Sequence, residues 1–285
     1  MCLLVLAWNV HPRFRLVVAA NRDEFHDRPA APLDWWQDVP GVLAGRDLRG
    51  AGTWMGVSRT GRFGVLTNYR DLEPPPAPDA PSRGGFVPQF LADETAPGPW
   101  LEGLRAGARR YAGFNLLVGT DEELCYFSNR NDLEPRPLSP GVYGLSNHLL
   151  DSPWPKLLRA RERLRELVAT DRLYAEPLFD LLADRTQAEV DAIPPTGLPP
   201  DWERALSAPF VVHDRYGTRC STVLLVERRG RATMLERRFD AHGLQTGASR
   251  WHFDTEAGGG RRAKSRSAVT PGRAVPRAAL GAPIE

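Results

Sequence analysis

The chain has 285 residues, of which 42% are hydrophobic and 25% charged, a composition that excludes coiled coils, collagen-like chains and polytopic membrane proteins. Its formal net charge of +2 is unevenly distributed, because residues 258–285 hold six basic residues and one acidic residue. The other 31 basic and 34 acidic residues make the body of the chain mildly acidic, which argues against a nucleic-acid-binding domain.

The first predicted elements are two strands over residues 3–8 and 15–20, joined by the turn-forming residues 9–12. Both strands are almost continuously apolar, which is typical of a sheet that is covered on both faces. The apolar start is too short for a membrane span and has no basic residues before it, so we expect no secretory signal. Three cysteines without a paired spacing favour a reducing, cytoplasmic location.

Further strands are predicted over residues 53–58, 63–67, 114–118, 124–128 and 142–145, followed by a hairpin of residues 221–226 and 232–238. Helices are predicted over residues 82–92, 153–169 and 173–184. Strands, then helices, then strands indicate an α+β fold rather than repeated βαβ units.

Residues 1–255 are predicted to form a single domain, because the strands at its two ends need each other. Pro-rich stretches at 74–81 and 194–200 are expected to be surface loops of that domain. Residues 256–285 form a basic tail without apolar periodicity and are expected to be disordered. The run RRAKSR within the tail is either a loose anion contact or a solvated end.

Common cofactor and catalytic motifs do not occur in the chain. There is no G-x-S-x-G, no P-loop and no dinucleotide fingerprint opening a helix, and the six histidines lack metal-ligand spacing. We therefore predict neither a resident cofactor nor a metal. The expected ligand is a small molecule, and the sequence leaves the oligomeric state open.

Cys2 is the strongest candidate for chemistry. If Met1 is removed, Cys2 carries both a thiol and a free α-amine, and an amine with a pKa of about 7.7–8.0 can act as the base for its own nucleophile. The alternative is that Cys2 is a small hydrophobic residue at the start of a buried strand.

A dense polar cluster, Asn21-Arg22-Asp23-Glu24, follows the second apolar run. In an antiparallel hairpin, the end of this second strand lies beside the start of the first. A guanidinium there would favour a thiolate, and a carboxylate could orient the α-amine. The alternative is an ordinary polar strand end with surface ion pairs.

These features resemble the NRDE family, which includes the transport and Golgi organisation proteins. The likeness begins with Met-Cys-Leu-Leu and Asn21-Arg22-Asp23-Glu24 and spans about residues 1–250. It continues through Gly45-Arg46-Asp47, Gly52-Thr53-Trp54-Met55-Gly56, Leu66-Thr67-Asn68-Tyr69-Arg70, Leu145-Ser146-Asn147 and Tyr216-Gly217-Thr218-Arg219-Cys220-Ser221-Thr222. The resemblance implies a four-layer αββα sandwich of the N-terminal nucleophile hydrolase type.

The resemblance also implies a set of catalytic residues, which are Cys2, Asn21, Arg22, Asp23, Asn68, Asn147 and Arg219. Cys2 would attack a carbonyl, Arg22 and Asp23 would tune its thiol and amine, and the two later asparagines would hold the oxyanion and the amine. Asn68 and Asn147 could instead be turn-forming residues at strand ends, and Arg219 an edge residue.

One departure from the hydrolase pattern concerns the arginine. That pattern is Arg-x-x-Asp, whereas Arg22 and Asp23 are adjacent here. In an extended chain Asn21 and Asp23 share a face that is opposite to Arg22, so Asn21 could take part of the role of Arg22.

Two functions follow from the resemblance. The first is a cysteine N-terminal nucleophile hydrolase or acyltransferase acting on a small amide or thioester, which as an amidohydrolase would cleave C–N bonds other than peptide bonds. The second is a non-enzymatic binding or trafficking protein for haem or for acyl-CoA and lipid, as the family's association with haem and lipid homeostasis and with Golgi organisation implies.

Only two of the 37 basic residues are lysine, a usage typical of GC-rich bacterial genomes.

Overall fold

The computed structural model describes residues 3–70, 80–170, 173–194 and 196–256. The predicted tail therefore lies outside the described residues except for Glu256, and so does most of the Pro-rich stretch at 74–81. Within the described parts of the chain, no helix is both long enough and apolar enough to cross a membrane.

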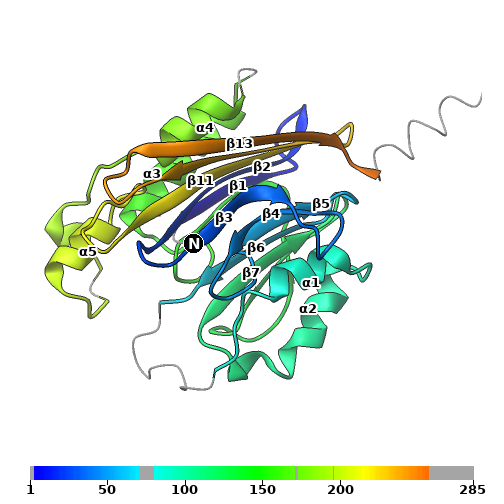
Figure 1. Cartoon of the computed structure of the whole chain (residues 1–285), viewed down its shortest axis with the longest axis horizontal. Helices are drawn as coiled ribbons and strands as arrows, with labels where there is room; N and C mark the ends of the chain where they lie inside the picture. Colours follow the sequence, from blue (N-terminus) through cyan, green and yellow to red (C-terminus); the bar gives the residue numbers. More distant parts are fainter. Residues whose placement is uncertain (1–2, 71–79, 171–172, 195, 257–285) are drawn as a thin grey trace, which may run out of the picture.

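Two antiparallel sheets form the centre of the fold (Figure 1). The first has the strand order β10 (Gly141–Leu145), β1 (Leu3–Trp8), β2 (Phe14–Phe25), β11 (Tyr216–Glu227), β12 (Arg231–Phe239) and β13 (Gln245–Asp254). The second has the order β3 (Ala30–Trp35), β4 (Val42–Asp47), β5 (Met55–Ser58), β6 (Phe63–Asn68), β7 (Phe114–Gly119), β8 (Leu124–Ser128) and β9 (Arg136–Pro137).

Helices cover the outer face of each sheet. The first sheet carries α3 (Pro155–Val168) and α4 (Ala175–Leu182), and the second carries α1 (Phe86–Ala92) and α2 (Pro97–Arg105). Among the described residues, the other helical elements are α5 (Pro200–Leu206) and the short turns η1 (Ala108–Arg110) and η2 (Val190–Ala192). The predicted four-layer αββα sandwich is confirmed.

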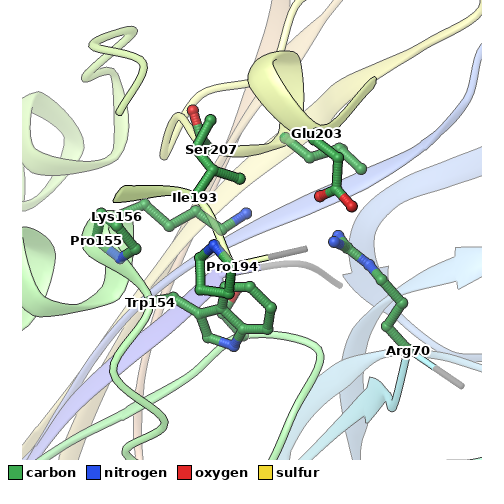
Figure 2. Close-up of a pocket in the computed structure, with 10 residues that line it drawn as sticks. Arg70, Trp154, Pro155, Lys156, Ile193, Pro194, Glu203 and Ser207 are labelled. Atoms are coloured by element: carbon green, nitrogen blue, oxygen red, sulfur yellow. The ribbon is translucent and has the colours of Figure 1, made fainter. Parts of the chain in front are cut away.

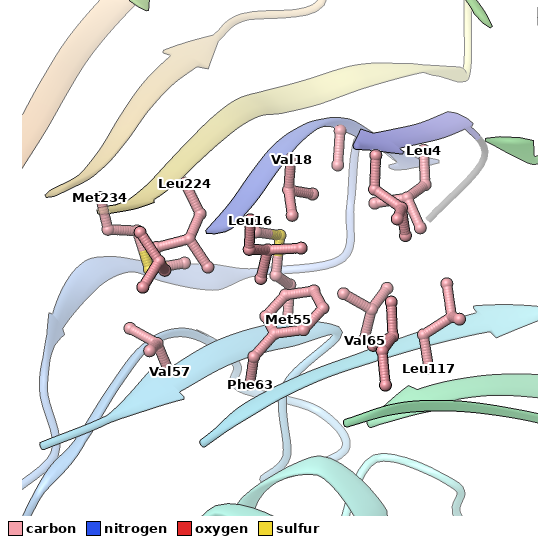
Figure 3. Close-up of a cluster of buried hydrophobic side chains, with 14 of the residues drawn as sticks. Leu4, Leu16, Val18, Met55, Val57, Phe63, Val65, Leu117, Leu224 and Met234 are labelled. Carbon is pink, nitrogen blue, oxygen red and sulfur yellow. The ribbon is translucent and has the colours of Figure 1, made fainter. Parts of the chain in front are cut away.

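Three apolar layers hold these elements together, and β2 shows how one strand serves two of them. Its side chains at 16, 18 and 20 lie in the core between the sheets, whereas those at 17 and 19 pack under α3 and α4. Figure 3 shows Leu16 and Val18 pointing from β2 toward Met55, Phe63 and Val65 of the second sheet. This two-sided burial explains the continuous apolar runs, as predicted.

The strand β2 is longer than the sequence indicated. It continues through the polar cluster to Phe25, because β11 pairs with it as far as Tyr216 opposite Phe25. The polar residues at 21–24 therefore do not follow the strand but form part of it, and their side chains alternate between its faces.

The predicted helix at 82–92 begins only at Phe86. The carbonyl oxygen of Gly84 accepts a hydrogen bond from the Thr53 N–H (3.1 Å), which places residues 82–85 against the 50–53 segment instead of in a helix. A Cβ on Gly52 would lie 2.1 Å from that carbonyl oxygen, so this approach requires glycine. The two segments together form a wall of the cleft described below.

Candidate functional site

A cleft of about 360 Å³ opens where the ends of several strands of the two sheets meet. The 50–54 and 80–84 segments form much of its wall. Its charged lining consists of Arg22, Glu24, Arg28, Asp47 and Arg83. Asn68 also lines the cleft, at the end of β6.

Arg22 is the most buried charged group of this cleft, with only 3% of the residue exposed. The alternation along β2 turns its side chain to the face between the sheets, the face that Val18 and Ala20 also occupy. Its guanidinium lies 4.5 Å from the centre of the Trp54 ring, a cation–π contact. Nη2 donates to Asp47 Oδ2 at 3.0 Å, whereas Nη1 is buried without a hydrogen-bond partner among the described residues.

Asp47 fixes the arginines of the cleft. Its Oδ2 also accepts from Arg28 Nε at 2.7 Å, while Oδ1 accepts from the N–H groups of Arg49 and Gly50. Burial opposes ionisation of Asp47, but the Gly50 N–H and the guanidinium groups of Arg28 and Arg22 outweigh it and hold its pKa below the usual value. Asp47 is therefore a fixed anion between two arginines.

Asn21 and Asp23 lie on the opposite face of β2. Asn21 Nδ2 donates to the carbonyl oxygens of Leu182 and Pro209, both at 2.9 Å, and its Oδ1 accepts from Ser221 Oγ at 2.6 Å. Asp23 Oδ1 accepts from Thr218 Oγ1 at 2.6 Å. Both side chains thus bind β2 to its surroundings on the helix-covered side, and neither is part of the cleft lining given above.

Asn68 and Asn147 come together from different sheets. Asn147 follows β10 in a left-handed conformation (φ 55°), which asparagine tolerates better than most residues. Its Nδ2 donates to the backbone oxygen of Asn68 at 3.1 Å, and its own backbone oxygen accepts from the Arg70 N–H at 2.7 Å. Asn147 is buried, whereas Asn68 is exposed in the cleft.

Arg219 lies at an irregularity in the pairing of β11 with β2, between Thr218 and Cys220. Its Nη1 donates to the backbone oxygen of His26 at 2.7 Å, and its Nε is buried without a partner among the described residues. The cleft lining does not include it. The structure thus brings Arg22 and Asn68 to one cleft and places Arg219 outside that cleft.

The predicted nucleophile, Cys2, lies outside the described residues. The first described residue of β1 is Leu3, which pairs with Asn21, and Arg22 is the next residue along β2. The two described cysteines are poor nucleophiles. Burial, together with the nearby Glu123, raises the pKa of Cys125 to about 11, and burial combined with Glu236 raises the pKa of Cys220 even further.

A second cavity lies beside Asn147 but holds only about 20 Å³, which is the space of a single water molecule. Figure 2 shows the charged ends of Arg70 and Glu203 pointing toward each other on one side of it, with Trp154 and Pro194 to their left. Thr196 connects the two, since Arg70 Nη1 donates to Thr196 Oγ1 at 3.4 Å and that hydroxyl donates to Glu203 Oε1 at 2.6 Å. This cavity is too small for a substrate.

Sequence reasoning did not assign roles to Asp47, Arg28 and Arg83. Asp47 belongs to the Gly45-Arg46-Asp47 motif and could have been singled out there, whereas Arg28 and Arg83 stand in no motif. Across residues 3–70, 80–170, 173–194 and 196–256, no group of three or more His, Cys, Asp or Glu residues could hold a metal ion.

Comparison with known proteins gives the following relatives. The family model described as Transport and Golgi organisation 2 matches residues 1–241. The Transport and Golgi organization protein 2 homolog of Bos taurus is 37% identical over 278 residues, covering 90% of this chain and 98% of the relative. The Mus musculus homolog is 33% identical over 275 residues, with the same coverage of both chains.

Two solved structures are also similar. A Caenorhabditis elegans ortholog of N-acylethanolamine-hydrolyzing acid amidase has a TM-score of 0.47 at 11% identity and covers 79% of this chain and 92% of its own. A mutant conjugated bile acid hydrolase from Clostridium perfringens has a TM-score of 0.47 at 8% identity and covers 89% and 92%.

Proposed function

We propose that this chain, which belongs to the Transport and Golgi organisation 2 family, is a cysteine N-terminal nucleophile hydrolase or acyltransferase acting on a small amide or thioester. The single observation that carries the proposal is the guanidinium of Arg22, which is buried beside the cleft with its Nη1 donor unused by any described residue. A buried donor of this kind is costly unless a partner uses it.

Chain continuity connects Arg22 with Cys2. Cys2 directly precedes Leu3, and Leu3 pairs with Asn21 in the antiparallel register of β1 and β2. The proposal extends this register by one residue, which sets Cys2 opposite Arg22. Directly opposed residues of an antiparallel pair share a face, so the thiol would meet the guanidinium on the side between the sheets.

The proposed reaction begins with removal of Met1, which frees the α-amine of Cys2. The amine takes the thiol proton, the guanidinium of Arg22 stabilises the thiolate, and sulfur attacks the carbonyl carbon. The tetrahedral intermediate collapses to a thioester on Cys2 while the leaving amine or thiol takes the proton. Water, or an acceptor nucleophile in an acyl transfer, then releases the acyl group and restores the thiol.

Asn68 is the proposed oxyanion donor. Its side chain is exposed in the cleft, and its backbone oxygen is held by Asn147 Nδ2 at 3.1 Å. We assign Asn147 the role of a positioning residue that fixes the end of β6. The cleft volume of about 360 Å³ lies at the lower end of the range for ligand pockets, which supports a small acyl group.

The proposal is tested with the untagged protein. Intact mass spectrometry establishes whether Met1 is absent, and a panel of acyl thioesters and N-acyl amides is then screened for turnover by wild type, Cys2→Ala and Cys125→Ala. We expect Cys2→Ala to lose turnover and the covalent acyl adduct while keeping the wild-type fold, and Cys125→Ala to keep both. Retained Met1, or equal turnover by Cys2→Ala, would refute the mechanism.

The alternative, a carrier of haem or acyl-CoA, makes a different prediction in the same experiment. A carrier binds its ligand saturably and equally well in wild type and Cys2→Ala, and it releases that ligand unchanged. Titration of both proteins with haem and with an acyl-CoA, with mass analysis of the recovered ligand, separates the two functions.

A further inference from the structure

The wall of the cleft holds one arginine in a fixed position. Arg83 is partly buried, and its Nη1 donates to the backbone oxygen of Gly113 at 2.7 Å. The neighbouring backbone is held as well, because the Gly84 carbonyl oxygen accepts from the Thr53 N–H and Gly52 packs closely against it. The side chain of Arg83 is thus anchored at the cleft with part of its guanidinium not used by that bond.

The charges around the cleft leave Arg83 without a counterion among the described residues. Asp47 accepts from both Arg22 and Arg28, and Glu24 Oε2 lies 3.9 and 3.8 Å from the same two guanidiniums. Arg22 and Arg28 therefore share these two carboxylates. No described carboxylate lies within 4 Å of Arg83. The lining of the cleft carries a net charge of +1.

The position of Arg83 is also electrostatically unfavourable for a cation. Burial lowers its pKa, and the nearby cations Arg28 and Arg130 lower it further, while Glu24 only partly compensates. A guanidinium remains charged at any physiological pH, so a nearby anion is what would offset this cost.

We propose that Arg83 is a specificity-determining residue that binds an anionic group of the substrate, a carboxylate or a phosphate, at the cleft beside Arg22. This inference rests on the proposed function and names the class of its substrate. A guanidinium binds either oxyanion through parallel N–H···O hydrogen bonds. The carbonyl under attack would then lie between the anionic end at Arg83 and the thiol of Cys2.

The first experiment compares two alkylating reagents of similar size that differ in charge. Iodoacetate and iodoacetamide both transfer a two-carbon group to the Cys2 sulfur and release iodide. Their rates at Cys2 are measured by mass spectrometry of the N-terminal peptide in wild type, Arg83→Met, Arg83→Lys and the control Arg163→Met, and in the denatured protein. Arg163 lies on α3 with an exposed side chain paired to Glu166.

We expect the iodoacetate-to-iodoacetamide rate ratio of wild type to fall about fivefold or more in Arg83→Met, to recover partly in Arg83→Lys and to stay unchanged in Arg163→Met. An unchanged ratio in Arg83→Met, at a Cys2 that still reacts faster than in denatured protein, would overturn this inference and leave the proposed function standing. A Cys2 that reacts no faster than in denatured protein would overturn both.

A second measurement does not depend on Cys2. Calorimetric titration with inorganic phosphate and with acetate compares wild type, Arg83→Met and Arg163→Met, and the better of the two anions identifies the group. Binding that is lost only in Arg83→Met supports the assignment. Equal binding by wild type and Arg83→Met, or no binding by wild type at anion concentrations up to about 100 mM, would overturn it.

Discussion

Replacing Asp47 with asparagine tests whether the cleft is organised around this carboxylate. The substitution keeps the shape of the side chain but removes its charge, so Arg22 and Arg28 lose the anion that they share at 3.0 and 2.7 Å. The amide could still accept from the N–H groups of Arg49 and Gly50 only by turning its own NH2 toward the arginines.

The size of the expected stability loss follows from the burial of Arg22. Breaking a buried ion pair by neutralising one partner costs about 3–5 kcal/mol, because the other charge stays buried and uncompensated. The side chain of Arg22 is 3% exposed, so it belongs in this class, whereas that of Arg28 is 32% exposed and can turn to water. We therefore expect the free energy of unfolding to fall by about 3 kcal/mol at pH 7, at the lower end of that range.

The lowered pKa of Asp47 determines how its contribution to stability changes with pH. The pKa of Asp47 is depressed in the folded protein, so its contribution is complete above the unfolded pKa of about 3.9 and is lost as the pH falls through the folded value. Urea unfolding of wild type and Asp47→Asn should show the full difference at pH 7 and a shrinking one below about pH 4.

The matched control is Asp38→Asn, which removes a carboxylate that binds Arg46 through two hydrogen bonds at the surface. Its loss of stability should be much smaller, since solvent screens exposed pairs. A difference for Asp47→Asn below about 1 kcal/mol at pH 7, or one that persists unchanged at pH 3, would show that the cleft is not organised around the charge of Asp47.

Three further predictions concern the same region and the thiols. Gly52→Ala should unfold at a lower urea concentration than wild type, because its Cβ would meet the Gly84 carbonyl oxygen, and an unchanged midpoint would contradict this close approach. At pH 8, iodoacetamide should modify neither Cys125 nor Cys220 in the folded protein but both after denaturation. Peptide mass mapping would measure this, and modification of either cysteine in the folded protein would contradict their raised pKa values. Asn68→Ala should lower kcat/KM for any substrate found in the screen by about 10²–10³-fold, and a loss below threefold would remove Asn68 as the oxyanion donor.

Local sequence signals were sufficient for most of the strands that are buried on both sides, although they missed β4, whose Leu43 packs between the sheets and whose Val42 and Ala44 pack under the helices. The apolar runs at 3–8 and 63–67 became β1 and β6 within one residue, because continuous burial imposes continuous apolarity. The strands β3, β4, β9 and β13 were not predicted. Six of the ten residues of β13 are exposed, and β3 contains a proline, so neither carries the pattern of a buried strand.

In the candidate site, too, some features could be predicted from the sequence and others depend on tertiary packing. The opposite orientation of Arg22 to Asn21 and Asp23 in β2 could be predicted from the sequence alone, because side chains alternate along any strand. The sequence also identified the candidate residues, through its resemblance to the family. Which of the two faces meets the second sheet depends on the tertiary packing, which brings Arg22 to the cleft, sets Asn21 beside the end of α4 and leaves Asp23 bonded to Thr218 of β11.

The same applies to the charges that surround Arg22. Asp47 and Arg83 come from segments 25 and 61 residues further along the chain, and no local periodicity connects either of them with Arg22. Their meeting depends on the packing of two sheets and on the close approach of Gly52 to Gly84. The sequence determined the alternation of side chains within each strand, and the packing of the layers determined which of those side chains share a cleft.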